Sequence, residues 1–180
     1  KLTPDIAVFS KAMANGYAMA AVIGTRKVME ADQTTFISST NWTERIGPVA
    51  ALATIKKLVA TDTPTRLAKI GKRVKEAWGL ASNKHNVPIV VGGSDAIASF
   101  SFSGENGQAL KTLFVQEMLE QGILASNLFF GTLAHTSAHV DQYAKAIDRS
   151  FATLKMAIDT GTIEKRLKGP VAHTGFARLN

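Results

Sequence analysis

The chain has 180 residues, of which 46% are hydrophobic, and it carries a formal net charge of +7 at pH 7. It contains no cysteine, which excludes disulfides and thiolate metal sites and agrees with a cytoplasmic location. No apolar run reaches the roughly 18 residues typical of a membrane span, so we expect a soluble protein without a membrane partner. The basic residues are dispersed, and the densest group, around residues 69–75, falls on the polar side of a predicted helix. We therefore interpret it as a solvated face and expect no nucleic-acid partner.

The first predicted element is an apolar strand within residues 4–10, and Lys11 follows it directly. A stretch rich in small residues, 12–21, leads into a second strand that ends at Gly24. A lysine after a strand is commonly a solvated surface charge. However, an amine used for carbonyl chemistry is best held at a strand end, beside backbone thin enough for a planar cofactor. Imine formation with an aldehyde cofactor would make Lys11 reactive although its free amine is mostly protonated.

A second group of functional side chains comprises Ser38, Ser39 and Thr40. They precede a helix predicted to begin between Ile46 and Pro48 and to end near Val59. Hydroxyls and backbone N–H groups close to a helix start can bind a phosphate, because the helix start has unpaired donors and a positive dipole end. Such clusters also serve as ordinary turns and caps. The expected inward-facing residues of the helix are Val49, Ala50, Ala53 and Leu58.

The remaining elements follow from periodicity and turn residues. Thr63-Pro64 begins an amphipathic helix that ends near Asn83. Two strands, 87–91 and 97–102, are joined by a turn at 92–95, and a helix over 108–121 is closed by Gly122. Extended structure over 123–130 precedes a last long helix capped by Ser137. The expected buried stripes of the two long helices are Leu67, Ile70, Val74, Ala77, Trp78 and Ala81 in the first, and Val140, Ala144, Ile147, Phe151, Leu154 and Ile158 in the second.

Two histidines, His135 and His139, have the spacing of metal ligands on one helix face. No acidic or cysteine cluster accompanies them, and His135 precedes the expected cap. We therefore assign them a capping or surface role and predict no metal site.

Residues 4–24 resemble the lysine motif of the class III aminotransferases, which are fold-type I enzymes dependent on pyridoxal 5'-phosphate (PLP). The resemblance is strongest to the branch that contains glutamate-1-semialdehyde 2,1-aminomutase. A Pro-Asp pair, an apolar strand, Ser10-Lys11, a turn of small residues and a strand ending in Gly24 occur in the family's order. Ala18 departs from the pattern, because many relatives have a proline there that would fix φ.

The resemblance implies an α/β fold. Residues 1–84 would form the C-terminal part of the PLP-binding large domain, including a bridging helix, and residues 85–180 a small α+β C-terminal domain. By the same resemblance Lys11 is the Schiff-base lysine and the general acid/base. Ser39 and Thr40, followed by Ser38, would bind the cofactor phosphate of the other subunit. The complete protein would then be a homodimer with a shared active site that acts on a small-molecule amine or amino acid.

The same comparison implies that the chain is a C-terminal piece that is inactive alone. A glycine-rich phosphate turn, an aromatic that stacks on the pyridine ring and an aspartate that pairs with its nitrogen would lie upstream, and Asp5 is not that aspartate. Three activities stay open at this point. They are amino transfer between molecules, intramolecular amino transfer of the aminomutase type, and a non-catalytic α+β interaction module in which the lysine is incidental.

Overall fold

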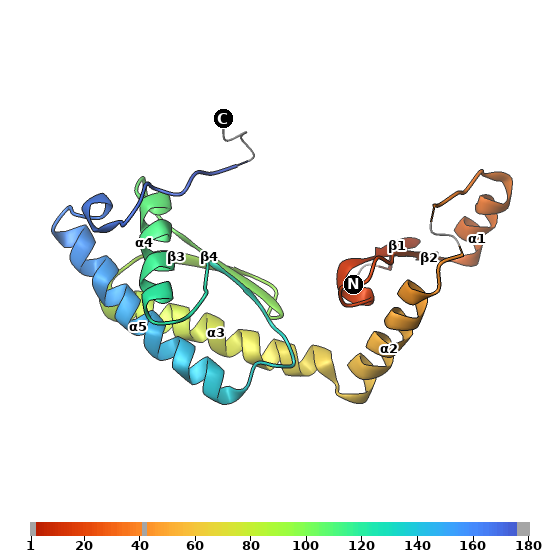
Figure 1. Cartoon of the computed structure of the whole chain (residues 1–180), viewed down its shortest axis with the longest axis horizontal. Helices are drawn as coiled ribbons and strands as arrows, with labels where there is room; N and C mark the ends of the chain where they lie inside the picture. Colours follow the sequence, from red (N-terminus) through yellow and green to blue (C-terminus); the bar gives the residue numbers. More distant parts are fainter. Residues whose placement is uncertain (1–2, 41–42, 176–180) are drawn as a thin grey trace. The chain divides into compact units, whose positions relative to one another are not determined.

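The computed structural model describes residues 3–40 and 43–175, and the chain divides into two compact units, 1–63 and 64–180 (Figure 1). We describe each unit by itself. Within the described ranges no helix combines the length and apolar character needed to cross a membrane. The expected boundary between residues 84 and 85 concerns the domains of a complete protein and stays a prediction. In this chain the long helix that precedes it packs with the second unit.

The first unit is built around the strand pair predicted from the sequence. Strand β1 (Ile6–Phe9) pairs antiparallel with β2 (Ala21–Gly24), so that Phe9 lies opposite Ala21. The connection contains a short 3₁₀ turn, η1 (Lys11–Met13). After β2 come a one-turn helix, α1 (Arg26–Met29), and a second 3₁₀ segment, η2 (Glu30–Thr34). The hairpin therefore places Lys11 directly beyond the end of β1.

Helix α2 (Ile46–Ala60) completes the first unit and begins where the sequence predicted. Gly47 is buried because the backbone of Ala18 lies directly against it. A Cβ at residue 47 would lie 2.7 Å from the carbonyl oxygen of Ala18. The predicted inward stripe is wrong for Val49, which is 65% exposed, and for Ala53, which is also exposed. The close approach to residue 18 selects the smallest side chains, so Gly47 and Ala51 are buried instead.

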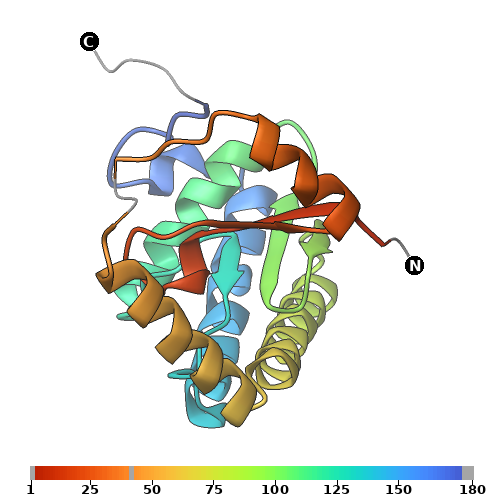
Figure 2. The same ribbon diagram turned by 90° about the vertical axis from the view of Figure 1, so that its right-hand side faces the viewer.

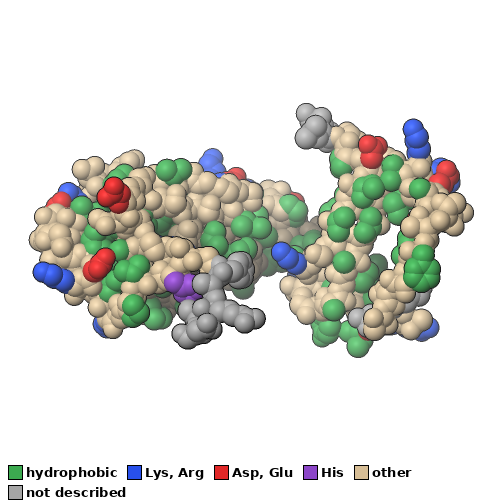
Figure 3. Space-filling model, turned by 90° about the horizontal axis from the view of Figure 1, so that it is seen from above, with side chains coloured by type: hydrophobic (Ala, Val, Ile, Leu, Met, Phe, Trp, Pro, Cys, Tyr) green, Lys and Arg blue, Asp and Glu red, His purple; other side chains and the backbone are tan. Residues whose placement is uncertain are grey.

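Most large hydrophobic side chains among the described residues of the first unit are exposed (Figure 3). Val8 is 69% exposed, Val59 78% and Phe36 93%. A two-stranded sheet exposed on both faces is marginally stable by itself. The first unit therefore gains little stability from a core of its own.

The second unit contains a three-stranded antiparallel sheet in the order β3-β4-β5. Its strands are β3 (Ile89–Gly93), β4 (Ile97–Phe102) and β5 (Leu128–Phe130). Strand β3 starts two residues later than predicted because the N–H of Val87 donates to the carbonyl of Ser82 and closes the preceding helix. It also runs through Gly92 and Gly93, and the turn starts at Ser94. Gly93 has φ +73°, a conformation that glycine adopts without strain.

The helices of the second unit are α3 (Thr63–His85), α4 (Gly107–Glu120) and α5 (Ser137–Asp159), followed by the short turn η3 (Glu164–Arg166). Helices α4 and α5 pack against each other (Figure 2). Ala98 and Phe100 of β4 are buried on the sheet face that meets the helices, whereas Ile97 on the opposite face is 50% exposed. The unit is thus a two-layer α+β arrangement with one covered sheet face.

The core of the second unit is centred on Phe100. Its ring lies 4.9 Å from the ring of Trp78 and 5.3 Å from that of Phe114, measured between centroids, in tilted and edge-to-face arrangements. Aromatic pairs at such separations and angles add stability beyond their buried area. The predicted stripes of α3 and α5 supply much of this core: Val74, Trp78, Ala81, Val140, Ile147, Phe151 and Leu154 are all buried.

The start of α5 differs from the prediction by one residue. Thr136, not Ser137, is the N-cap, and its side chain accepts a hydrogen bond from the N–H of His139 at 3.3 Å. The ring of His139 accepts in return from the N–H of Thr136, which closes a reciprocal capping box. This bears out the capping role assigned to His139.

Candidate functional site

Lys11 stands at the carboxyl end of β1 in a strained backbone conformation. Its φ is +50°, and the chain turns there because the N–H of Met13 donates to the carbonyl of Ser10 at 3.1 Å. A left-handed conformation in a residue other than glycine is uncommon and costs about 1–3 kcal/mol. Strain of this kind is concentrated at functional sites, where the surrounding structure holds it in place. The functional assignment of Lys11 stays a prediction.

The side chain of Lys11 is exposed, and no hydrogen bond or ion pair joins its amine to residues 3–40 or 43–175. The turn that follows Lys11 is rich in small residues. Ala14 is 1% exposed, while Asn15 and Gly16 have φ values of +49° and +108°. The amine is thus available to a ligand that approaches β1 from its carboxyl end.

The hydroxyls predicted to bind phosphate lie in an exposed segment without regular structure. Ser38, Ser39 and Thr40 are all exposed. The hydroxyls of the neighbouring Thr34 and Thr35 both donate to the carbonyl of Ala31 at 2.9 Å. The assignment of Ser38, Ser39 and Thr40 to a phosphate stays a prediction.

The start of α2 does not supply the free N–H groups that the sequence led us to expect. The Glu44 carboxylate accepts from the N–H of Ile46 and, at 2.9 Å, from the N–H of Gly47. A carboxylate at this position satisfies the donors and the helix dipole that a phosphate would use. The helix N-terminus is therefore not available to a phosphate in this unit.

The two histidines are fixed by hydrogen bonds that use one ring nitrogen each. Nδ1 of His135 accepts from the N–H of Thr132 at 3.1 Å, and Nδ1 of His139 accepts from the N–H of Thr136 at 3.3 Å. Within the described parts of the chain, no group of three or more acidic or histidine side chains is arranged to hold a metal ion. Sequence reasoning missed a different feature at these residues, a cavity of about 650 Å³ between β5 and α5. Its walls come from residues 122–143 and from Val74 of α3, and the cavity forms only when the loop, β5 and the start of α5 fold against one another.

Comparison with known proteins places this geometry in a family. Residues 1–151 match the family model for class-III aminotransferases, so the chain belongs to that family. The 2'-deamino-2'-hydroxyneamine transaminase of Streptomyces kanamyceticus is 26% identical over 151 residues, covering 81% of this chain and 38% of that protein. The glutamate-1-semialdehyde 2,1-aminomutase of Clostridium kluyveri is 28% identical over 166 residues, covering 82% of this chain and 39% of that protein.

Solved structures of transaminases share the fold. The FumI protein of Sphingopyxis sp. MTA144, solved with PLP, superposes with a TM-score of 0.77 at 22% identity, covering 87% of this chain and 38% of that one. An omega-transaminase from Sphaerobacter thermophilus gives a TM-score of 0.76 at 18% identity, covering 86% and 40%. These likenesses confirm the expected fold class. The chain spans about two fifths of the length of the relatives it matches.

Proposed function

We propose that the complete protein is a PLP-dependent aminotransferase that works as a homodimer on a small-molecule amine or amino acid. The observation that carries the proposal is Lys11. It is exposed, without a hydrogen bond or ion pair among the described residues, and held in a left-handed conformation beside small residues at the end of β1. Membership of the class III family supports the same reading.

The residues present suit the cofactor. The exposed primary amine of Lys11 suits the aldehyde of PLP, and the hydroxyl groups of Ser38, Ser39 and Thr40 are of the kind that bind its phosphate. When bound, PLP supplies the electron sink that makes the substrate α-carbon acidic. The Nζ atom of Lys11 would hold the cofactor and then move the proton at that carbon. The hydroxyls of the partner subunit would orient the phosphate end.

The test of the lysine assignment uses the complete protein. Lys11→Ala should remove the visible absorbance of bound PLP and lower kcat by about 100–10,000-fold, the range for loss of a positioned acid/base. Lys27→Ala is the matched control, because Lys27 is also exposed in the first unit and makes no ion pair within the described residues. Unchanged absorbance in the Lys11 variant would remove the assignment of Lys11, and a complete protein that never shows this absorbance would favour a non-catalytic module. We also expect the 180-residue chain by itself to show no turnover.

A shared active site can be tested by mixing subunits. One subunit carries Lys11→Ala and the other carries Ser39→Ala with Thr40→Ala, so each homodimer is defective. If Lys11 and the hydroxyls meet across the dimer, the mixed dimer contains one intact site and regains activity. If they meet within one subunit, both sites of the mixed dimer stay defective. The pair Thr34→Ala and Thr35→Ala is the control, since their hydroxyls are already bonded to Ala31.

Intramolecular amino transfer is the second candidate. The relatives include both transaminases and aminomutases at similar identity, 26% and 28%. A mutase returns the amino group to the same carbon skeleton and needs no keto acid, whereas an aminotransferase stops after one half-reaction without one. Turnover measured with and without an external keto acid separates the two.

A further inference from the structure

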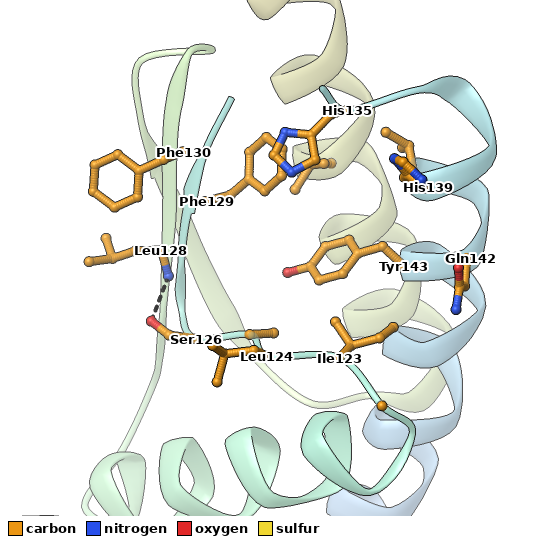
Figure 4. A pocket seen from close by; sticks show the side chains of 14 residues that line it. Ile123, Leu124, Ser126, Leu128, Phe129, Phe130, His135, His139, Gln142 and Tyr143 are labelled. Atoms are coloured by element: carbon orange, nitrogen blue, oxygen red, sulfur yellow. Dashed lines mark hydrogen bonds between the residues drawn. The ribbon is translucent and has the colours of Figure 1, made fainter. Parts of the chain in front are cut away.

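The second unit contains a cavity of about 650 Å³ that the proposed chemistry does not use (Figure 4). It lies between β5, the loop 122–126 that leads to this strand, and the first turns of α5. Its volume falls within the range of about 300–1,000 Å³ typical of small-molecule sites. All of its lining residues belong to the second unit, so the site does not depend on how the two units are arranged.

The walls of the cavity are mainly apolar. Ile123 and Phe129 line it from the loop and the strand, while Val74 and Val140, which are 0% and 5% exposed, close it from the two helices. The Phe129 and His135 rings lie side by side, with centroids 5.0 Å apart (Figure 4). The two rings therefore pack against each other and form one aromatic surface of the wall, on which an apolar ligand body can lie.

The polar side chains that line the cavity are those of Ser126, His135, His139, Gln142 and Tyr143. Among the residues that the structure describes, no aspartate, glutamate, lysine or arginine lines it. Because Nδ1 of His135 and of His139 each accepts a backbone N–H, the hydrogen of each neutral ring is on Nε2. The Tyr143 hydroxyl accepts from Nε1 of Trp78 at 3.1 Å, which leaves its own hydrogen to donate. Burial raises the pKa of Tyr143 to about 12, so this donor stays neutral at physiological pH.

We propose that this cavity binds an uncharged aromatic or alicyclic compound that carries one hydrogen-bond acceptor, such as a ketone. The apolar walls receive the ring, and the donors of His135, His139 and Tyr143 receive the acceptor. The absence of a lining cation disfavours a carboxylate, and the absence of a lining anion disfavours an amine. The proposal concerns the second unit alone and does not rest on the proposed enzymatic function.

The first test compares three probes by calorimetry with the 180-residue chain. They are 2-acetylnaphthalene, 2-ethylnaphthalene, which has the same ring without an acceptor, and 2-naphthoate, which is charged. We expect the ketone to bind about tenfold more tightly than the ethyl compound, as one net hydrogen bond allows. Equal affinity of these two, or tighter binding of the naphthoate, would overturn the proposal.

The second test locates the ligand. The chain has four histidines, and two of them, His85 and His173, lie outside the cavity. Adding the ketone should shift the ring proton resonances of His135 and His139 and leave those of the other two unchanged. His135→Phe keeps an aromatic ring but removes the donor, so it should weaken ketone binding about tenfold, with His173→Phe as the control. Shifts confined to His85 or His173 would place the ligand elsewhere, whether or not the His135 variant folds.

Discussion

The tightest backbone approach in the second unit makes a sharp prediction about Gly71. This residue of α3 is buried against the turn between β3 and β4, and a Cβ built on it would lie 1.4 Å from the carbonyl oxygen of Asp95. Gly79, two turns later in the same helix, has nothing within 4 Å of such a Cβ. Comparing alanine substitutions at these two glycines therefore separates the effect of helix propensity from the effect of packing.

The magnitude follows from these distances. Alanine is favoured over glycine in a helix by about 1 kcal/mol, so Gly79→Ala should raise the free energy of unfolding by up to that amount. In Gly71→Ala the turn must move by roughly 2 Å to restore ordinary contact. That turn is held by Lys75, whose Nζ donates to the carbonyl of Gly93 at 2.7 Å and to Asp95 at 3.0 Å. Overpacking of this kind costs about 1–3 kcal/mol. Because both variants gain the same helix propensity, their free energies of unfolding should differ by about 1–3 kcal/mol.

The assay is urea denaturation of the chain followed by far-UV circular dichroism. We expect the transition of Gly71→Ala to move to lower urea and that of Gly79→Ala to move slightly higher, with unchanged slopes. If Gly71→Ala is as stable as Gly79→Ala, then α3 and the Asp95 turn do not meet as closely as described, and the reasoning fails.

Three further predictions concern the second unit. Thr136→Ala should lower the free energy of unfolding by about 1 kcal/mol, whereas Ser137→Ala should stay within about 0.5 kcal/mol; the reverse order in urea titrations would restore Ser137 as the cap. Phe100→Ala should cost about 3–5 kcal/mol, far more than Val90→Ala on the exposed face, and similar denaturation midpoints would contradict the placement of the core. The carboxylate of Asp148 accepts hydrogen bonds from Lys84 and His85, each at 2.8 Å. These hydrogen bonds lower the pKa of Asp148, and the bond from Lys84 has the larger effect. Its stabilisation is therefore present above the ordinary carboxyl pKa of about 3.9 and is lost as the pH falls through the lowered folded value. Asp148→Asn should lower the free energy of unfolding by up to about 1 kcal/mol at neutral pH, since the ion pair is partly exposed. The difference in stability between the variant and the original chain should shrink in acid; a difference that persists in acid would show that the loss is not electrostatic.

The long helices of the second unit could be read from the sequence because their periodicity is strong. Val74, Trp78 and Ala81 in α3, and Ile147 and Phe151 in α5, are buried as predicted. In each of these 23-residue helices, apolar residues recur every three or four positions, so only one face of the helix can be the buried one. In α2 apolar residues occur all round the helix, so periodicity could not select the buried side, and Val49 was misplaced.

Caps and local contacts were harder to predict because several residues can make the same hydrogen bond. Thr136 and Ser137 are both good caps, and the ring of His139 decided between them by closing the box with Thr136. Ser38, Ser39 and Thr40 were expected near helix donors, but Glu44 lies closer to α2 and occupies those donors. The cavity beside His135 and Tyr143 had no sequence signal, because loop, strand and helix meet there only after folding.

What the sequence determined by itself was the strand, Lys11, the turn of small residues and the strand to Gly24, together with the family to which that order belongs. These features are set by neighbouring residues, whose conformational preferences do not depend on the rest of the chain. Only the tertiary structure decided that α3 touches the Asp95 turn at Gly71 and that a donor-lined cavity opens between β5 and α5. Contacts between distant segments depend on how closely two backbones pack, and no single stretch of sequence contains that information.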